Sequence, residues 1–317
     1  MTRVLVVEVR RYLARRLTRV LVGLAVVASA VAGVVVFINS EKAGDEALAR
    51  ALARREASVA SCADVQQQIR PRPGFGELEQ QGVAIDRERA EEACRRFIEV
   101  DVDTFQLVDL WHPDGDSYLL TTFVFLGIGA LIGAASMVGA EWKAGTFTTL
   151  LTWEPRRARV AVAKLVTAGL LAVAAAVVLQ AVFVTALLPS IVFRGTTEGA
   201  DADWLRTLLG GVARGAGLSG IAAVAGASVA MIGRSTSATL GVAFAYLAVG
   251  EAIVRAWKPK MARWLVGENS AIFLTGERLD GAPFERGVAL AAVTLVGFML
   301  ALAALATLTF RTRDVTA

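Results

Sequence analysis

Residues 119–164, "LLTTFVFLGIGALIGAASMVGAEWKAGTFTTLLTWEPRRARVAVAK", begin and end with apolar residues and carry charged and polar residues between them. Residues 119–140 carry no charged side chain, and a second apolar run begins near residue 160. Between the two runs lie a Gly-Thr pair, two Trp, one Pro and three Arg. About 20 apolar helical residues cross roughly 30 Å of hydrocarbon. The stretch therefore predicts a membrane span, a short polar connection and a second span.

The rest of the chain repeats this pattern of long apolar runs. The 317 residues are 55% hydrophobic, with a mean hydropathy of +0.55, whereas soluble domains are about 45–50% apolar. Inside lipid every backbone N–H and C=O must be paired within the segment, so each run is predicted to be a helix. The predicted fold class is an all-α membrane protein with six transmembrane helices: Val20–Ile38, Leu119–Ala140, Val160–Val192, Leu208–Ile232, Ala238–Val254 and Val288–Phe310.

Lys and Arg near the ends of the runs predict the orientation, because cytoplasmic loops carry an excess of both. Six Arg precede the first run, which places the N-terminus in the cytoplasm. Six crossings then place residues 139–159, residues 233–237 and the tail 311–317 inside as well. Arg156, Arg157, Arg159, Arg234, Arg311 and Arg313 agree with this orientation, and Arg255, Lys258, Lys260 and Arg263 disagree.

The N-terminal residues 1–19 predict an amphipathic helix that leads into the first span. Apolar residues share one face and Arg residues lie mostly opposite, which suits a helix in the inner headgroup layer. The alternative is a plain basic flank that only sets orientation. The apolar face consists of Val9, Tyr12, Leu13, Leu17 and Val20.

Residues 39–118 form the one sizeable water-soluble segment and predict a small helical extracytoplasmic domain. Residues 41–118 hold 17 Asp and Glu against 10 Lys and Arg. Helices are expected over Lys42–Ala60 and Asp86–Val100. The only two cysteines, Cys62 and Cys94, lie here. Outside the cytoplasm they are expected to form one disulfide, with two unpaired thiols as the alternative.

The residues that catalysis or metal binding requires are scarce. One His and two Cys cannot supply a tetrahedral metal site, and no polar cluster in the spans suggests an enzyme. The sequence also lacks a Gly-x-x-x-x-Gly-Lys-Ser/Thr loop, which would cradle nucleotide phosphates. No catalytic residue, metal or cofactor is predicted for this chain, and no nucleic-acid partner is expected.

The connection at residues 141–157 predicts a short helix held between two spans. Glu141 is expected to end the second span, Gly145 to break it and Thr146 to cap the new helix. Pro155 stops this helix, because proline lacks an N–H and restricts the residue before it. Lys164 is expected to extend toward the headgroups. The apolar face of Phe147, Leu150 and Leu151 suits either a partner site or packing on the chain's own helices.

The order Glu141, Gly145-Thr146, Leu150-Leu151, Pro155, Arg157 and Lys164 resembles the signature of the membrane (permease) subunits of type-two ATP-binding-cassette (ABC) exporters. The basic lead-in helix, the six spans and "FRTRDV", residues 310–315, fit the same family. The resemblance implies that residues 141–157 form the coupling helix that docks on an ATPase. The implied docking residues are Glu141, Gly145, Thr146, Phe147, Leu150, Leu151, Pro155 and Arg157.

The resemblance also implies the partners. ATP and magnesium would bind two copies of a separate ATPase, and a second permease chain, identical or a paralogue, would complete the pathway in the bilayer. The nearly uncharged spans favour a hydrophobic or amphipathic exported cargo such as a lipid, drug or antibiotic. The 28 Arg against 5 Lys suggest a bacterial source, and hence its cytoplasmic membrane. The alternative function is a non-transporting scaffold or sensor with residues 39–118 as receptor.

Three further features of the apolar segments allow predictions. Arg214 and Glu251 lie near the outer ends of the fourth and fifth spans and are expected to pair or to line a pathway; the alternative for Arg214 is a side chain that extends to the membrane surface. Gly129-x-x-x-Gly133 and Gly211-x-x-x-Gly215 fit close helix contacts, within the chain or across a dimer. The segment Arg255–Arg286 is expected to hold one more amphipathic helix on the outer surface.

Overall fold

The computed structural model describes residues 2–40, 118–195, 200–276 and 284–313, and these residues contain helices and turns but no strand. The chain divides into two compact units. Within the described residues, the larger unit holds 2–31, 118–186 and 200–313, and the smaller holds 32–40 and 187–195. The elements are α1 (Thr2–Ala14), α2 (Arg16–Asn39), α5 (Tyr118–Lys143), α6 (Thr146–Trp153), α7 (Arg157–Phe193), α8 (Ala202–Gly233), α9 (Thr236–Phe244), η2 (Ala245–Gly250), α10 (Glu251–Trp257), η3 (Pro259–Trp264), α11 (Val266–Thr275) and α12 (Val288–Thr312).

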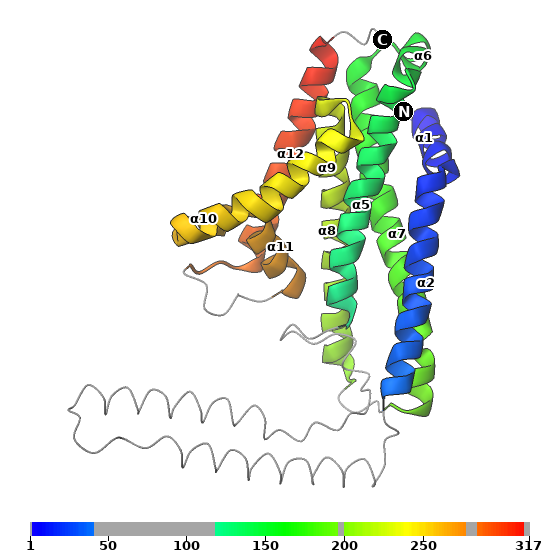
Figure 1. Ribbon diagram of the computed structural model, residues 1–317, viewed down its shortest axis with the longest axis vertical. Coiled ribbons are helices and arrows are strands. Elements are labelled where there is room, and N and C mark those ends of the chain that lie inside the picture. The colour runs from blue at the N-terminus through cyan, green and yellow to red at the C-terminus, as the bar shows by residue number, and fades with distance from the viewer. Residues whose placement is uncertain (1, 41–117, 196–199, 277–283, 314–317) are drawn as a thin grey trace, which may run out of the picture. The chain divides into compact units, whose positions relative to one another are not determined.

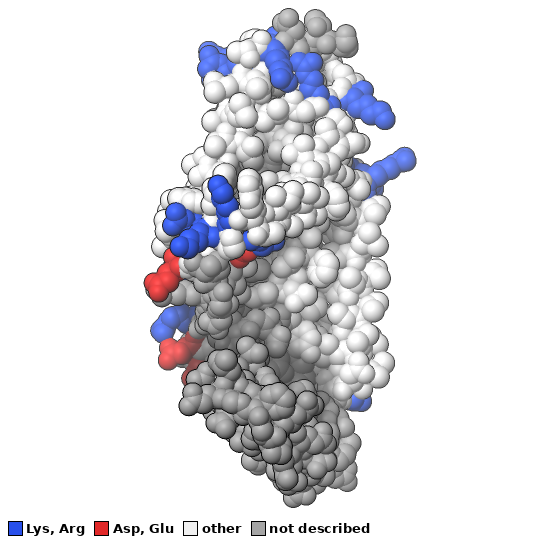
Figure 2. All heavy atoms as spheres, turned by 60° about the vertical axis from the view of Figure 1, so that its left-hand side comes forward, with Lys and Arg blue, Asp and Glu red and all other residues white. Residues whose placement is uncertain are grey.

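Six helical segments are long and apolar enough to cross a membrane, which confirms the number predicted from the sequence. They are α2, α5, α7, α8, the continuous segment Thr236–Trp257, and α12. Each contains one of the predicted runs and extends it by a few residues at one or both ends. Figure 2 shows one group of Lys and Arg at the upper end of the visible face and a second group of Lys, Arg, Asp and Glu lower on its left side, with a mostly uncharged surface on the right. This arrangement fits a multi-pass membrane protein.

Helices α5 and α8 make the most extensive contact in the larger unit and lie side by side in Figure 1. Glycines permit the close approach, because a Cβ at Gly226 would lie 2.6 Å from the Leu131 carbonyl oxygen. A Cβ at Gly215 would overlap the ring of Phe123. Gly215 therefore serves packing within the chain, and so does Gly133, whose Cβ would lie 2.8 Å from the Tyr12 hydroxyl.

The core cluster lies among α5, α6, α7, α8 and α12 and is built largely from alanine. Small side chains let apolar helices approach closely, so dispersion contacts replace the hydrophobic driving force that lipid does not supply. Two aromatic rings, Phe147 and Phe310, fill the wider space near one end of the cluster. Its buried members are Ala134, Ala135, Val138, Phe147, Val160, Ala161, Leu165, Ala168, Ala172, Ala223, Ala227, Ala230, Met231, Ala306 and Phe310.

The N-terminal segment is helical as expected, but its boundary differs from the prediction. The helix breaks at Arg15, and α2 already begins at Arg16 rather than at Val20. Leu13 and Leu17 are exposed, whereas Glu8 is 1% exposed and Tyr12 is half-buried. Glu8 contacts the protein because Lys164 pairs with it, and Tyr12 packs beside Gly133.

The fifth span begins directly after a tight turn that follows α8. Arg234 adopts φ 53°, and the Ser235 side chain accepts a hydrogen bond from Ala238 N at the start of α9. The span then passes through six residues of π-helix, η2, before α10. The additional helix expected in 255–286 is present as α11, preceded by the 3₁₀ turn η3.

The smaller unit contains the end of α2 and the end of α7. Arg194 Nη1 donates to the carbonyl oxygen of Ser40 at 2.6 Å, and its guanidinium carbon lies 4.2 Å from the centroid of the Phe37 ring. These two contacts join the ends of the two helices. Most of the predicted extracytoplasmic domain, including Cys62 and Cys94, lies outside the described residues.

Candidate functional site

One glycine, Gly145, makes the backbone turn between α5 and α6. Gly145 adopts φ 65° and ψ 13°, a left-handed conformation that glycine accepts without steric cost. The prediction that Thr146 caps the helix is wrong, because Gly145 occupies the N-cap position and Thr146 is the first helical residue. The Thr146 hydroxyl instead donates backward to the Glu141 carbonyl oxygen at 3.3 Å. The break predicted at Gly145-Thr146 is confirmed.

Phe147 holds α6 against the bundle. The ring is 1% exposed and its centroid lies 4.6 Å from that of Trp142 and 5.3 Å from that of Phe310. The prediction of an exposed Phe147 docking residue is therefore wrong: three rings from α5, α6 and α12 bury one another. Leu150 and Leu151 are partly buried against the same core, so the apolar face of α6 packs largely on its own bundle.

The exposed face of α6 carries a different set of side chains. Trp153 at the end of the helix is 86% exposed. Thr148, Thr149 and Thr152 are exposed as well. Trp side chains are enriched both at membrane–water interfaces and at the centres of protein–protein interfaces. Trp153 is therefore the apolar group that α6 offers to its surroundings.

The helix ends as Pro155 predicts. Trp153 is its last residue, and Glu154 is extended with φ −129° and ψ 94°. The Glu154 carboxylate accepts a hydrogen bond from Arg159 Nη1 at 3.1 Å. Arg157 Nη1 donates to the Arg313 carbonyl oxygen at 2.7 Å, which ties the start of α7 to the end of α12.

A buried cation lies just beneath α6. Lys164 is fully buried, and its Nζ lies 2.8 Å from Glu8 Oε2 and 2.6 Å from Glu141 Oε2. The same Nζ lies 5.3 Å from the centroid of the Phe147 ring. The prediction that Lys164 extends to the headgroups is wrong, because two carboxylates compensate the desolvation of the ammonium group inside the protein.

Arg15 completes this group, which we call the Lys164 cluster (Glu8, Arg15, Glu141 and Lys164). Arg15 Nη2 lies 3.4 Å from Glu141 Oε1, and Nη1 donates to the Ser136 carbonyl oxygen at 2.9 Å. Arg11 Nη1 also lies 3.6 Å from Glu8 Oε1 at the exposed edge of the cluster, so its two acids contact three bases. It connects the α1–α2 break, α5 and α7 with ion pairs whose atoms are mostly removed from water.

Tyr12 lies on the same face of α1 as Glu8 and Arg15. Burial raises the pKa of the Tyr12 hydroxyl above its usual range, and the nearby charge of Arg15 opposes this shift only in part. The hydroxyl therefore stays protonated at neutral pH and packs in the space left by Gly133.

Sequence reasoning missed Glu8. A signal was present, since Glu8 is the only acidic residue among the first 40, in a segment with six Arg before the first span. An acid at that position is unfavourable for a helix that lies on anionic headgroups. It becomes favourable once a buried lysine pairs with it.

The predicted pair of Arg214 and Glu251 does not form among the described contacts. Glu251 is 2% exposed, pairs with Arg255 Nη2 at 2.8 Å and accepts a hydrogen bond from Gly267 N at 2.8 Å. Arg214 Nη2 donates to the Thr275 carbonyl oxygen at 3.3 Å. Both side chains thus bind to the α10–α11 region through separate partners. The nearest basic residue on the same helix face, four positions away, satisfies Glu251.

Comparison of the chain with protein-family models, with curated proteins and with solved structures gave no match. The resemblance to type-two ABC permeases therefore stays a prediction from the sequence. The site itself consists of a short helix fixed by Phe147, an exposed Trp153 and the Lys164 cluster beneath them.

Proposed function

We propose that this chain is the membrane subunit of an ATP-driven transporter, similar to the permeases of type-two ABC exporters, and that α6 docks on a separate ATPase. The observation that carries the proposal is the construction of α6. It is an eight-residue helix between two membrane-length helices. Its inner face is fixed by Phe147, while Trp153 is left 86% exposed.

The docking face in this proposal consists of Trp153 with Thr148, Thr149 and Thr152. It replaces the face of Phe147, Leu150 and Leu151 that the sequence suggested. Large aromatic side chains at the centre of an interface commonly supply most of its binding free energy. The threonine hydroxyls around the ring can exchange hydrogen bonds with a partner.

Force applied to α6 would reach several helices at once. Phe147 contacts Trp142 of α5 and Phe310 of α12, and the Lys164 cluster joins α1, α5 and α7. In the proposed cycle, the ATPases bind nucleotide, close and move the two α6 helices of a permease dimer. Such coupling requires that the ATPase contacts differ between the inward- and outward-open states.

The remaining parts of the proposal follow from the same layout. Both termini and α6 face the cytoplasm of a bacterium, and the cargo is hydrophobic or amphipathic. A second permease chain, identical or a paralogue, completes the pathway. ATP and magnesium bind the partner ATPase.

Substitution of Trp153 tests the docking proposal. We expect Trp153→Ala to weaken association with the ATPase about 30-fold, the effect of removing an interface residue worth about 2 kcal/mol. The tagged chain is purified from native membranes, the ATPase is identified by mass spectrometry, and vanadate-sensitive ATP hydrolysis is measured. Trp153→Ala is preferable to Leu150→Asp, because Leu150 packs on the core and its loss would also affect folding.

The matched control is Trp257→Ala, which removes another highly exposed Trp, 79% exposed at the end of α10. It should leave ATPase association unchanged. Recovery of the wild-type chain without any ABC ATPase would contradict the transporter proposal. Equal association of wild type and Trp153→Ala would contradict the docking face.

A further inference from the structure

Exposed cations and exposed apolar side chains lie together where α10 passes into η3. Figure 1 shows α10 leading away from the neighbouring helices, so its end is accessible from outside. Six consecutive or near-consecutive side chains are exposed there, and we call them the α10–η3 surface: Trp257, Lys258, Lys260, Met261, Arg263 and Trp264.

The cations of the α10–η3 surface have no carboxylate partner. Arg255, which precedes them, lies 2.8 Å from Glu251 Oε2 and 2.7 Å from Glu268 Oε1, so its charge is compensated. By contrast, none of the three cations of the surface forms an ion pair in the described part of the chain. The surface therefore presents positive charge that an anionic partner can neutralise.

Each exposed ring of the surface lies close to a cation. Lys258 Nζ lies 5.4 Å from the centroid of the Trp257 ring, and the Arg263 guanidinium carbon lies 5.7 Å from that of Trp264. The guanidinium carbon of Arg286 lies 5.0 Å from the same Trp264 ring. Trp rings are enriched at the boundary between hydrocarbon and water, and cations at that boundary are attracted to anionic headgroups. Neighbouring rings and cations thus match a phospholipid, whose phosphate lies next to its acyl chains.

Buried contacts hold the α10–η3 surface in shape. Pro259 begins η3, and Ala262 and Leu265 are buried. Asn269 is fully buried, and its Nδ2 donates to the carbonyl oxygens of Arg263 at 3.0 Å and Leu265 at 2.6 Å. The exposed side chains therefore extend from a fixed turn, which lowers the entropic cost of binding a partner.

The α10–η3 surface continues the exposed side of the fifth span. Only 11% of the apolar stretch of this span is buried, and η2 within it has no buried residue. In a membrane, acyl chains cover such a span and the headgroups of the same lipids lie beside its end. Phospholipid is therefore the neighbour that the α10–η3 surface meets.

We propose that the α10–η3 surface binds the headgroups of anionic phospholipids. Its three exposed cations contact the phosphates, while its two indole rings and Met261 lie at the level of the upper acyl chains. Bound lipid holds the end of the fifth span, of which little is buried against its own chain. This binding does not depend on the proposed docking of an ATPase, because α6 and the α10–η3 surface share no residue.

Lipid binding to the purified full-length chain in lipid-free detergent tests the proposal. Phosphatidylglycerol and phosphatidylcholine with the same acyl chains are titrated separately, and native mass spectrometry measures the affinity for the first bound lipid. Each cation near an anionic headgroup favours binding about fivefold. We therefore expect phosphatidylglycerol to bind at least tenfold more tightly than phosphatidylcholine, and equal affinities would overturn the proposal.

Two variants separate the roles of charge and of the rings. The triple variant Lys258→Gln, Lys260→Gln, Arg263→Gln should weaken phosphatidylglycerol binding at least tenfold and leave phosphatidylcholine binding unchanged. Trp257→Ala should weaken the binding of both lipids by the same factor, because an indole ring does not distinguish headgroup charge.

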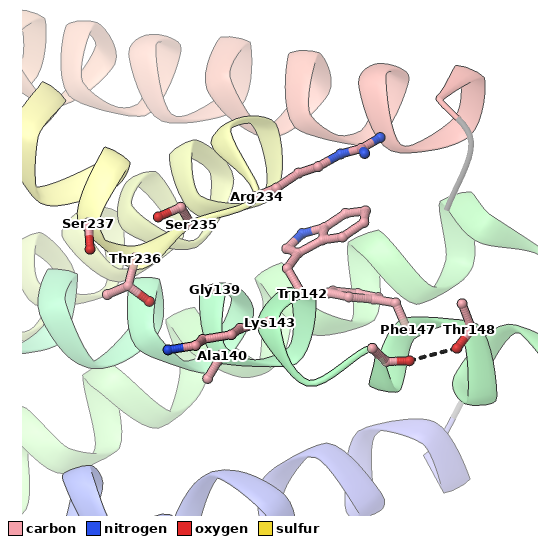
Figure 3. Close-up of a pocket in the computed structure, with 11 residues that line it drawn as sticks. Gly139, Ala140, Trp142, Lys143, Phe147, Thr148, Arg234, Ser235, Thr236 and Ser237 are labelled. Atoms are coloured by element: carbon pink, nitrogen blue, oxygen red, sulfur yellow. Dashed lines mark hydrogen bonds between the residues drawn. The ribbon is translucent and has the colours of Figure 1, made fainter. Parts of the chain in front are cut away.

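The matched control is the triple variant Lys143→Gln, Arg156→Gln, Arg311→Gln, which removes three exposed cations at the end of the chain's helices where α6 lies. Figure 3 shows the side chains of Lys143 and Arg234 extending in opposite directions from the pocket beside α6, so they form no joint cationic surface. The control should change phosphatidylglycerol binding less than twofold.

Two outcomes of this comparison count against the proposal. An equal loss of phosphatidylglycerol binding in both triple variants would show that general surface charge attracts the lipid. Unchanged lipid binding together with an altered oligomeric state in the α10–η3 triple variant would identify a second copy of the chain as the occupant of the surface.

Discussion

The environment of Lys164 in the fold differs from the one that its place in the sequence predicts. In the sequence Lys164 is the fifth residue of an apolar run, where extension toward the headgroups is the usual outcome. In the fold it is fully buried between Glu8 and Glu141, residues that lie 156 and 23 positions away in the chain. The buried charges are stable only together, because a single buried charge without a partner keeps its full desolvation cost.

Removal of the lysine alone should therefore be more damaging than removal of the lysine together with both carboxylates. We expect Lys164→Met to destabilise the chain by about 3–5 kcal/mol, because two buried carboxylates lose their shared partner. The readout is the thermal unfolding midpoint in detergent, followed by intrinsic fluorescence.

Two comparisons make this measurement specific. Lys260→Met changes an exposed lysine and should leave the midpoint within experimental error. The triple variant Glu8→Gln, Glu141→Gln, Lys164→Met should recover part of the loss. A Lys164→Met midpoint equal to that of the wild type would show that the cluster contributes nothing to stability.

At the scale of the element, α6 depends on one backbone conformation. Gly145 reverses the chain after α5 with φ 65°, and a Cβ there would meet nothing within 4 Å. The requirement for glycine is thus conformational and does not arise from crowding. Pro155 ends the helix after eight residues, a length at which no isolated helix is stable in water. Packing of Phe147 on Trp142 and Phe310 supplies the missing stability.

A side chain at residue 145 should loosen this turn. Gly145→Ala is expected to be unfavourable by about 1–2 kcal/mol, the steric penalty of a left-handed residue with a Cβ. Gly145→Asn should be better tolerated, because asparagine visits that region more readily. Protease digestion of the folded chain near residues 145–153, compared among the variants, provides the measurement.

Gly127→Ala is the control for this substitution. Gly127 also has open space around its Cα but lies within helix α5, where alanine is favoured over glycine. It should not increase cleavage in residues 145–153. If Gly145→Ala and Gly127→Ala behaved alike, the left-handed conformation of Gly145 would not be required for α6.

For the whole molecule, the proposed function requires α6 on the cytoplasmic side. The six membrane-length helices fix which connections share a side, because each crossing changes the side of the membrane. Basic residues around α6 and the N-terminus then favour the cytoplasm. The basic residues of the α10–η3 segment are the exception, and they adjoin the acids Glu251 and Glu268, which pair with Arg255.

Cysteine labelling measures this orientation directly. In a background with Cys62→Ser and Cys94→Ser, Thr152→Cys on the exposed face of α6 should resist a membrane-impermeant maleimide in intact cells. It should react fully in inverted membrane vesicles. Lys260→Cys should show the opposite pattern. Reaction of Thr152→Cys from outside intact cells would place α6 on the wrong side for an ATPase and would remove the transporter proposal.

The amino-acid sequence by itself determined the helical class, the six membrane-length segments, the break at Gly145-Thr146 and the stop at Pro155. These features depend on local chemistry: run length, charge content, and the backbone limits of glycine and proline. A helix within residues 255–286 was predicted too, but from the apolar and basic residues 257–265, which lie before α11.

Only the tertiary structure decided which face of each helix is buried. Phe147 fits both an exposed docking face and a buried aromatic cluster in the sequence, and Trp142 and Phe310 decide between them. Glu8 and Lys164 become partners only when α1 packs on α5 and α7. Pairing of this kind depends on distances between residues remote in sequence, which helical periodicity alone does not contain.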